Sequence, residues 1–193
     1  MRLSILIPTV PSRFDNYLPN ILKQINDQIT ALGRNDVELL VLYDNKKRTI
    51  GAKRNQLVSM AQGTHLVFID DDDAVSDDFV MLVCNALDSH PEIDCIVYDS
   101  MCTITNEFGV TKRHCVYGVE HEYYTSPDGT RWTGKPAHTM VYRSIIAKKH
   151  TYEDISEGED MAWVARAHKD IAVQARIDKI MYYYDADYRK SER

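Results

Sequence analysis

Four consecutive aspartates, Asp70 to Asp73, have the clearest chemical potential in the chain. They follow a short apolar run, Leu66 to Ile69, which is the pattern of a strand buried on both faces. At ~4 Å separation, each pair of carboxylates repels by about 1 kcal/mol in water and about 4 kcal/mol near a protein surface. A divalent cation would relieve this repulsion, because hard cations prefer oxygen ligands. The alternative is a solvated acidic turn before a helix, with Ser76 as its N-cap and Asp77 and Asp78 stabilised by the helix dipole.

The segments before this loop alternate between strand and helix patterns. Buried strands are predicted at Leu3 to Ile7 and Val37 to Tyr43, and helices at about Tyr17 to Ala31 and about Gly51 to Ala61. This β-α-β-α-β order implies parallel strands joined by right-handed crossovers. The carboxyl ends of parallel strands meet at one edge of the sheet, where open α/β sheets bind ligands. The sequence therefore predicts that the aspartate loop belongs to a ligand site.

Two further strand ends bring polar groups to the same edge. Pro8 and Thr9 follow the first strand, and Asp44 follows the second. The Asp44 carboxylate can accept hydrogen bonds from a nucleobase or a ribose, but an aspartate after a strand is also a common turn former. Lys53 and Arg54 lie on the first turns of the next helix, within reach of the site. The alternative is that these two side chains cover a solvated helix face.

The second half of the chain is less regular. We predict a helix at 77–87, a strand at 94–98 and a hairpin over 100–118. A polar, turn-rich stretch over 119–136 predicts a mobile loop above the site. The remaining elements are a strand, a short helix, a longer helix and one or two late strands, which are predicted at 139–142, 144–149, 156–168 and 172–184.

The composition is that of an ordinary globular protein. The 193 residues are 44% hydrophobic and 27% charged, which favours one ordered domain with a real core. The net charge of −6 gives no overall basic footprint for nucleic acid. The four cysteines lack CxxC spacing, and we expect core thiols in a reducing compartment rather than disulfides or zinc ligands. The first apolar run is too short for a signal peptide, so we expect a cytoplasmic protein with no membrane span.

Five short motifs occur in order along roughly the first hundred residues. They are Ile5 to Thr9 (ILIPT), Asp44, Gly51 to Asn55 (GAKRN), Ala61 to Gly63 (AQG) and the FIDDDD run ending at Asp73. Together they resemble the nucleotide-binding half of glycosyltransferase family 2. The resemblance implies the GT-A fold, which is a Rossmann-like α/β domain with a mostly parallel central sheet flanked by helices, here with a small antiparallel element in the second half. It implies one domain over residues 1–193, with donor and metal binding in about 1–100, and acceptor binding and the catalytic base in about 101–193.

The resemblance also implies roles for single residues. The family's Asp-x-Asp metal motif corresponds to Asp70-Asp71-Asp72, so Asp72 would hold Mn²⁺ or Mg²⁺, and Asp70 or Asp71 would contact the ribose or the metal. The donor would be a nucleoside-diphosphate sugar, with a UDP-sugar as the default. The residues expected to bind this donor are Pro8, Thr9, Arg13, Asp44, Lys53, Arg54, Asn55, Asp70 and Asp71.

Glu159 and Asp160 form an acidic pair near the start of the helix predicted at 156–168. The family places such a pair at a helix start and uses its aspartate as the catalytic base. The resemblance therefore assigns this role to Asp160, with Glu159 as its neighbour. For Glu159 there is an alternative, because Ser156 followed three residues later by Glu159 is a capping box. A carboxylate base would take the acceptor proton in one direct displacement that inverts the anomeric carbon, while the metal neutralises the leaving diphosphate.

The acceptor side offers two weaker candidates, Trp132 and His138. Trp132 could stack on a sugar ring, and His138 could contact the diphosphate or metal, although a structural role is the alternative for the histidine. A glycan, a small molecule, a protein or a modified base in nucleic acid all remain open as acceptors. A sugar nucleotidyltransferase is a rival function, but it should have a glycine-rich loop where Pro8 to Arg13 has no glycine. A non-catalytic nucleotide- or glycan-binding module is a second rival, against which Asp160 and the aspartates argue.

Overall fold

Strands β1 (Leu3–Thr9), β2 (Val37–Tyr43) and β3 (His65–Phe68) form the N-terminal part of the sheet in the computed structural model, which describes residues 1–187 and 189. β1 lies between the other two strands and pairs with both in parallel. Every residue of β1 and β3 is buried, as expected for strands that are covered on both faces. The predicted parallel arrangement is confirmed, and the carboxyl ends of the three strands lie at one edge of the sheet.

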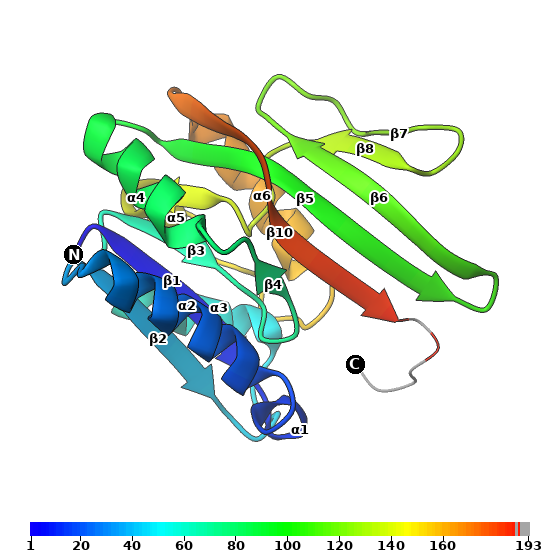
Figure 1. Cartoon of the computed structure of the whole chain (residues 1–193), viewed down its shortest axis with the longest axis horizontal. Helices are drawn as coiled ribbons and strands as arrows, with labels where there is room; N and C mark the ends of the chain where they lie inside the picture. Colours follow the sequence, from blue (N-terminus) through cyan, green and yellow to red (C-terminus); the bar gives the residue numbers. More distant parts are fainter. Residues whose placement is uncertain (188, 190–193) are drawn as a thin grey trace.

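Helices cover both faces of this sheet (Figure 1). On one face, α2 (Leu18–Leu32) packs against α4 (Phe79–Ser89). On the other face, α3 (Ile50–Met60), α5 (Ser144–Lys149) and α6 (Glu159–Ala167) contact one another. The candidate site residues on α3 and α6 are therefore brought together by helix packing on a single face.

The first two helices follow from local sequence signals. α1 (Pro11–Phe14) is a single turn after β1 that begins with proline, which suits a first helical position. In α2, Leu18, Ile21 and Ile25 recur at helical spacing and are buried against the sheet. α2 ends at Gly33, whose φ of 61° lies in the left-handed region that favours glycine.

The second half of the chain inserts a short antiparallel strand and then returns to a parallel one. β9 (Val141–Arg143) lies between β3 and β5 (Cys95–Asn106) and is antiparallel to both. β10 (Gln174–Asp187) runs parallel to β5, with register shifts between Ile177 and Tyr182. It also pairs with β4 (Ala74–Val75), which directly follows the aspartates. The last strand, β10, therefore lies next to the aspartate loop.

β5 and β6 (Gly109–Tyr117) form the predicted hairpin. The predicted break between a strand at 94–98 and this hairpin is wrong, because β5 is continuous. Its first residues pair with β9 and its later residues with β6, while β10 pairs along the other side of both parts. The neighbours on both sides therefore hold the whole length of β5 extended.

The mobile loop predicted over the site at 119–136 is also wrong. This segment contains β7 (Tyr124–Thr125) and β8 (Arg131–Gly134), and β8 extends the sheet beyond β6 (Figure 1). Trp132 anchors it, because its ring packs against Tyr117 and Tyr123 with centroids 5.3 and 5.9 Å apart. The aromatic and turn residues that indicated a loop therefore build a sheet edge.

α4 begins at Phe79, with Asp78 rather than Ser76 as the N-cap residue. The backbone of Ser76 still belongs to the β4 junction: its N–H donates to the Met181 carbonyl at 3.0 Å, and its carbonyl accepts from Gln28 at 3.0 Å. These two bonds fix Ser76 in place before the helix starts. The prediction of Ser76 as the N-cap of this helix is therefore wrong.

The strands form one sheet in the order β2-β1-β3-β9-β5-β6-β8-β7, with β10 pairing β5 and β4. A 3-10 turn, η1 (His168–Asp170), follows α6 and leads toward β10. The predicted fold class is confirmed: the chain is a single α/β domain with a mostly parallel central sheet, flanking helices and antiparallel pairs in the second half. Within the described residues, no helix is both long and apolar enough to cross a membrane.

Candidate functional site

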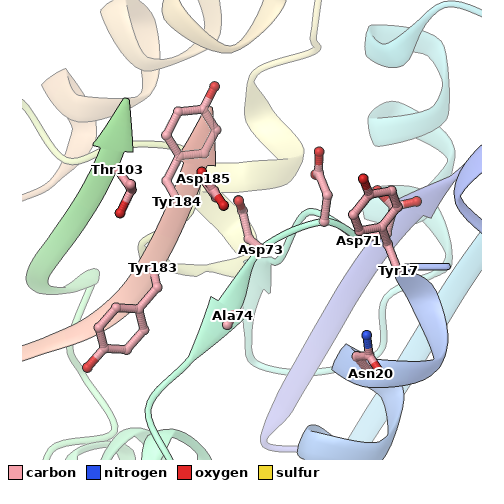
Figure 2. A pocket seen from close by; sticks show the side chains of 10 residues that line it. Tyr17, Asn20, Asp71, Asp73, Ala74, Thr103, Tyr183, Tyr184 and Asp185 are labelled. Atoms are coloured by element: carbon pink, nitrogen blue, oxygen red, sulfur yellow. The ribbon is translucent and has the colours of Figure 1, made fainter. Parts of the chain in front are cut away.

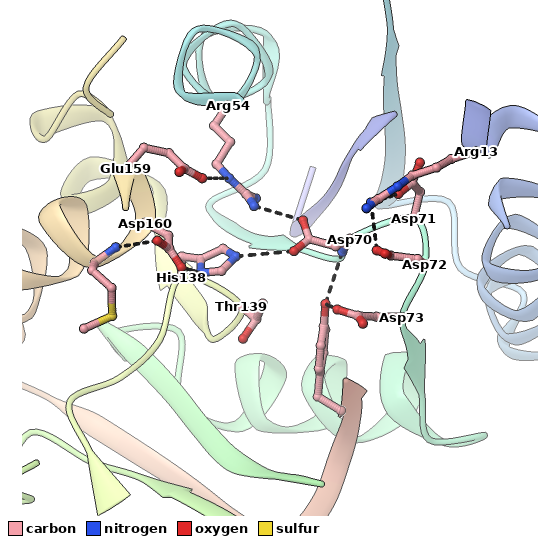
Figure 3. A network of polar contacts seen from close by, with 12 residues as sticks. Arg13, Arg54, Asp70, Asp71, Asp72, Asp73, His138, Thr139, Glu159 and Asp160 are labelled. Atoms are coloured by element: carbon pink, nitrogen blue, oxygen red, sulfur yellow. Dashed lines mark hydrogen bonds and ion pairs between the residues drawn. The ribbon is translucent and has the colours of Figure 1, made fainter. Parts of the chain in front are cut away.

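The four aspartate side chains of the loop divide among three partners, Arg54, Arg13 and Tyr182 (Figure 3). Asp70 accepts a hydrogen bond from Arg54 Nη2 at 2.9 Å. Arg13 Nη1 lies 2.9 Å from Asp71 Oδ1 and 3.0 Å from Asp72 Oδ1. Two guanidinium groups thus neutralise part of the charge, and the repulsion is weaker than four consecutive carboxylates predict.

Asp73 turns away from these cations toward β10. Tyr182 Oη donates to Asp73 Oδ2 at 2.5 Å and accepts from the backbone N–H of Asp70 at 3.1 Å. Asp73 Oδ1 is buried and has no hydrogen-bond partner in the part of the chain that the structure describes. Tyr182 is therefore a core residue that is also part of the site. No sequence signal distinguished it, because residues 182–184 are all tyrosine and do not alternate in type.

Burial and charge give the loop carboxyls different protonation behaviour. Burial would raise the pKa of Asp70, but the Arg54 guanidinium and a nearby imidazole outweigh it and hold the pKa well below its ordinary value. Burial raises the pKa of Asp72, and the neighbouring carboxylates add to this effect. For Asp73, burial and the charge of Asp70 raise the pKa to about 9. Asp70 therefore loses its proton more readily than Asp72 or Asp73.

Arg54 joins the aspartate loop to α6. It is only 4% exposed, and its guanidinium lies over the Phe68 ring, 4.9 Å from the centroid. Besides its bond to Asp70, its Nε lies 3.3 Å from Glu159 Oε1. Burial would lower the pKa of Arg54, but the surrounding acidic groups raise it above its ordinary value. The solvated helix face considered for Arg54 is therefore wrong, and so is the one for Lys53, which is 1% exposed.

The capping box predicted for Ser156 and Glu159 does not form. α6 begins at Glu159 after Gly158, whose φ of 79° lies in the left-handed region that favours glycine. Ser156 Oγ accepts instead from the backbone N–H of Ile50 at 3.4 Å. Glu159 is therefore free to pair with Arg54, and Asp160 occupies the first turn of α6 beside it.

One imidazole ring separates Asp160 from the aspartate loop (Figure 3). His138 Nδ1 lies 3.4 Å from Asp160 Oδ2, and His138 Nε2 lies 3.8 Å from Asp70 Oδ2. The other oxygen of Asp160 accepts from the backbone N–H of Met161 at 2.8 Å. The Asp160 side chain is 34% exposed, so a ligand can reach its carboxylate.

The ends of β1 and β2 meet at the buried Lys53. Its Nζ lies 3.3 Å from Asp44 Oδ1 and donates to the Thr9 carbonyl at 3.4 Å. Asp44 also accepts from the backbone N–H groups of Lys46 and Arg48 at 3.2 and 3.3 Å, as expected for the turn former that was the alternative to its role in nucleoside binding. Burial opposes ionisation of Asp44, but Lys53 and these N–H groups hold its pKa below its ordinary value.

Thr9 connects the cluster of Lys53 and Asp44 to the aspartate loop. Thr9 Oγ1 donates to Asp71 Oδ2 at 2.6 Å, and both residues are 2% exposed. Pro8 is buried in β1 opposite Leu42. The three strand ends that carried polar groups in the sequence are therefore neighbours, as predicted.

Two predicted site residues, Asn55 and Trp132, have other partners. The Asn55 side chain donates to the Tyr152 carbonyl at 2.8 Å and accepts from the Tyr152 N–H at 2.7 Å. It therefore ties α3 to the chain before α6. Trp132 lies on β8, which is separated from β10 by β5 and β6, so the structure does not bring it into the cluster.

A hollow of about 370 Å³ opens beside the loop (Figure 2). This volume falls within the range of roughly 300–1,000 Å³ that small-molecule sites occupy. Its lining comes from the loop, α2, β5 and the end of β10, and consists of Tyr17, Asn20, Asp71, Asp72, Asp73, Ala74, Thr103, Tyr183, Tyr184 and Asp185. Because four of these residues are aspartates, an anionic ligand would need a cation between itself and this wall.

The oxygen donors suit a hard divalent cation that a ligand helps to hold. Asp70 and Asp72 offer carboxylates, and Asp73 Oδ1 nearby is unsatisfied. Within the described residues, no group of three or more His, Cys, Asp or Glu side chains is arranged to hold a metal by itself. Mg²⁺ is commonly bound by one or two carboxylates together with substrate phosphates. The residues therefore fit a cation shared with a diphosphate, not an all-protein cage.

Solved structures of other proteins share the fold of this chain. TarS 1–349 from S. aureus in complex with UDP-GlcNAc matches with a TM-score of 0.66 at 18% identity, over 100% of this chain and 60% of that chain. HddC from Yersinia pseudotuberculosis complexed with GMP-PN matches with a TM-score of 0.53 at 11% identity, over 94% of this chain and 92% of that chain. These likenesses show the fold, and this chain spans less than two thirds of the TarS chain.

The sequence comparisons give a more specific result. No curated protein matches the chain. The family model described as Glycosyl transferase family 2 matches residues 14–155, which is well over half of the sequence and includes the aspartate loop and His138. The chain therefore belongs to glycosyl transferase family 2, and its fold is GT-A.

Proposed function

We propose that the protein is an inverting, metal-dependent glycosyltransferase that moves a hexosyl or pentosyl group from a UDP-sugar to an acceptor hydroxyl. The observation that carries this proposal is the approach of Asp160 to the aspartate loop through His138. Direct displacement needs the base and the diphosphate-binding groups close enough to face the same sugar ring. Family membership and the complex of TarS with UDP-GlcNAc support the donor class.

The proposed donor site extends along the carboxyl ends of β1, β2 and β3. The nucleoside lies beyond β1 and β2, where the ionised Asp44 accepts hydrogen bonds from the base and Asp71 accepts them from the ribose. Arg13 lies beside the diphosphate, because its guanidinium already bridges Asp71 and Asp72. Lys53 supports this arrangement by keeping Asp44 charged and by binding the Thr9 carbonyl.

Asp72 is the main proposed ligand for Mn²⁺ or Mg²⁺, with Asp70 as its partner. Arg54 already compensates the charge of Asp70, whereas burial and nearby carboxylates raise the pKa of Asp72 even though the Arg13 guanidinium lies 3.0 Å away. When bound, the cation neutralises the charge that builds on the leaving diphosphate.

The proposed reaction needs no nucleophilic side chain. Asp160 accepts the proton of the acceptor hydroxyl as that oxygen bonds to the anomeric carbon of the donor. The bond from this carbon to the diphosphate oxygen breaks, and its electron pair leaves with UDP. Attack from the face opposite the leaving group inverts the configuration. His138 orients the Asp160 carboxylate, and Glu159, held by Arg54, fixes the start of α6.

Replacement of Asp160 tests the proposed base. A thermal-shift screen of nucleotide sugars with and without Mn²⁺ first identifies the donor, and release of UDP from that donor then provides the activity assay. Asp160→Asn should lower turnover by roughly 10²–10⁴-fold, because general bases contribute this much, and should leave UDP affinity unchanged. Glu157→Gln, an exposed neighbour, is the matched control and should keep full turnover. Unchanged turnover in Asp160→Asn would remove it as the base.

A further inference from the structure

Two thiols outside the candidate site lie side by side. Cys102 on β5 and Cys115 on β6 place their Sγ atoms 3.4 Å apart. In the hairpin, Cys102 is opposite Arg113 and Cys115 is opposite Ser100, so the cysteines are diagonal neighbours on one face of the sheet. Both are free thiols. The sequence predicted only that the cysteines are core thiols, and nothing in their spacing indicated this pairing.

A small reagent can reach this pair. Cys102 is partly exposed, and both thiols line a second hollow of about 230 Å³ with Arg113, Trp132 and Tyr184. The other two cysteines are enclosed, because Cys84 is 1% exposed and Cys95 is 0% exposed. A reagent therefore reaches the pair through Cys102, since Cys115 is only 4% exposed, and the two enclosed thiols serve as internal controls.

We propose that Cys102 and Cys115 are a site of reversible oxidation, at which a small disulfide such as oxidised glutathione converts the two thiols into one disulfide within the chain. The sulfur atoms need to approach from 3.4 Å to the bond length of about 2.05 Å, which requires rotation of both side chains and a small shift of the β5 and β6 backbones toward each other. The proposal is independent of the glycosyltransferase assignment, since it concerns residues that take no part in the proposed reaction.

The chemistry proceeds in two exchange steps. The Cys102 thiolate attacks one sulfur of oxidised glutathione, which forms a mixed disulfide and releases one glutathione thiolate. Cys115 then loses its proton and attacks the Cys102 sulfur, which forms the Cys102–Cys115 bond and releases the second glutathione thiolate. The two protein thiols are oxidised, one glutathione disulfide is reduced to two thiols, and the two protein protons end on the glutathione products.

The surroundings favour Cys102 as the attacking sulfur. The hydrogen bond with Cys115 lowers the pKa of Cys102 to about 7 against the effect of burial, and Ser100 and Arg113 add to this lowering. The same contact and burial raise the pKa of Cys115, which therefore suits the second step. Burial raises the pKa of Cys84 to about 11, so that thiol stays protonated and inert.

The position of the pair also favours an easily reduced bond. Cα atoms of diagonal neighbours in a sheet are roughly 7–8 Å apart, whereas bonded cysteines usually have Cα atoms about 4.4–6.8 Å apart. A disulfide formed under this constraint is more reducible than a relaxed one. The bond would lie beside β10, because Cys102 is opposite Tyr184 and Ser100 is opposite the site residue Tyr182.

Peptide mapping after controlled oxidation tests the proposal. The folded wild-type protein is incubated with oxidised glutathione at several protein concentrations, and its remaining thiols are alkylated after unfolding. The protein is then cleaved with trypsin and with a protease that cuts before aspartate, so that each of the four cysteines lies on its own peptide, and the peptides are identified by mass spectrometry. We expect the Cys102 and Cys115 peptides to be linked, Cys84 and Cys95 to be alkylated, the yield to be independent of protein concentration, and reduced glutathione to reverse the bond. Cys115→Ser should stop at a glutathione adduct on Cys102, and Cys84→Ser should behave as wild type.

Each other outcome overturns the proposal. Full alkylation of Cys102 and Cys115 in the wild type would show that the thiols do not react. A wild-type product that stops at glutathione adducts would show that the two sulfurs cannot close a bond. Linkage that grows with protein concentration, or that involves Cys84 or Cys95, would show that a bond between chains or unfolding is responsible.

Discussion

Arg54 is the residue on which the candidate site depends most for its geometry. It is buried between Asp70 of the loop and Glu159 of α6. Arg54→Met should lower the free energy of unfolding by about 3–5 kcal/mol, because it leaves buried carboxylates without their cation. Urea denaturation measures this change. Arg166→Met, which breaks a pair with Glu153 at the surface, is the control and should cost less than about 1 kcal/mol. Equal losses in the two variants would contradict the role given to Arg54.

Tyr182 is predicted to fix the shape of the aspartate loop. Tyr182→Phe removes the hydroxyl that binds both Asp73 and the backbone N–H of Asp70. It should cost about 1–3 kcal/mol of unfolding free energy, since a buried N–H loses its acceptor. Tyr183→Phe on the same strand is a matched control, because Tyr183 is 43% exposed. Thermal or urea unfolding of both variants checks this prediction, and a control as unstable as Tyr182→Phe would refute it.

At the scale of residues, the sequence predicted which side chains lie at the candidate site better than it predicted the partners that they contact. The aspartate loop, Thr9 and Asp44 could be predicted because each follows a strand whose end must lie at the same edge of the sheet. The contacts of Tyr182 and His138 could not, because they depend on how β9 and β10 return to the sheet from distant parts of the chain. The pairing of Glu159 with Arg54 was hidden by a capping-box pattern that the backbone does not use.

At the scale of elements, Gly51 controls how closely α3 approaches the segment that leads to α6. Its N–H donates to the Ile155 carbonyl at 3.0 Å, and a Cβ at this position would overlap the Glu153 carbonyl. Gly51→Ala should therefore push this segment away and cost about 1–3 kcal/mol, the usual range for overpacking. It should also reduce turnover, because Asp160 follows the same segment. Unfolding and donor-turnover assays measure the two effects.

The control for this prediction lies on the same helix. Ser59 is exposed near the end of α3, so Ser59→Ala should change the stability only slightly and leave turnover intact. If Gly51→Ala were as stable and active as Ser59→Ala, the close approach of α3 to the 153–155 segment would not matter for the site.

Helices and strands could be predicted from the sequence where a single hydrophobic pattern dominated the segment. The parallel strands and α2 follow from apolar runs and helical spacing, and their order along the chain implied their arrangement. The break in β5 and the loop at 119–136 were wrong because both predictions rested on local polarity. Pairing with β10 and β6 keeps β5 continuous, and the packing of Trp132 turns a polar stretch into a sheet edge.

At the scale of the whole molecule, the candidate site lies at the boundary between the N-terminal and C-terminal halves of the chain. The N-terminal half supplies the strand ends of the proposed donor site and the aspartate loop, and α6 in the C-terminal half supplies Asp160. Arg54 contacts Glu159 and His138 contacts Asp70, and both contacts join the two halves. The acidic wall of the hollow beside the loop makes a cation the simplest means of holding a diphosphate there. Metal-dependent nucleotide binding is thus the central claim.

Calorimetric titration of the protein with UDP, in Mn²⁺ and then in excess chelator, tests this claim most directly. UDP should bind in Mn²⁺, and its affinity should fall by at least about tenfold, or about 1.4 kcal/mol, in chelator and in Asp72→Asn. Asp77→Asn, an exposed aspartate after the same loop, should bind as wild type does. Equal UDP affinity with and without metal, or in Asp72→Asn and the wild type, would contradict the account.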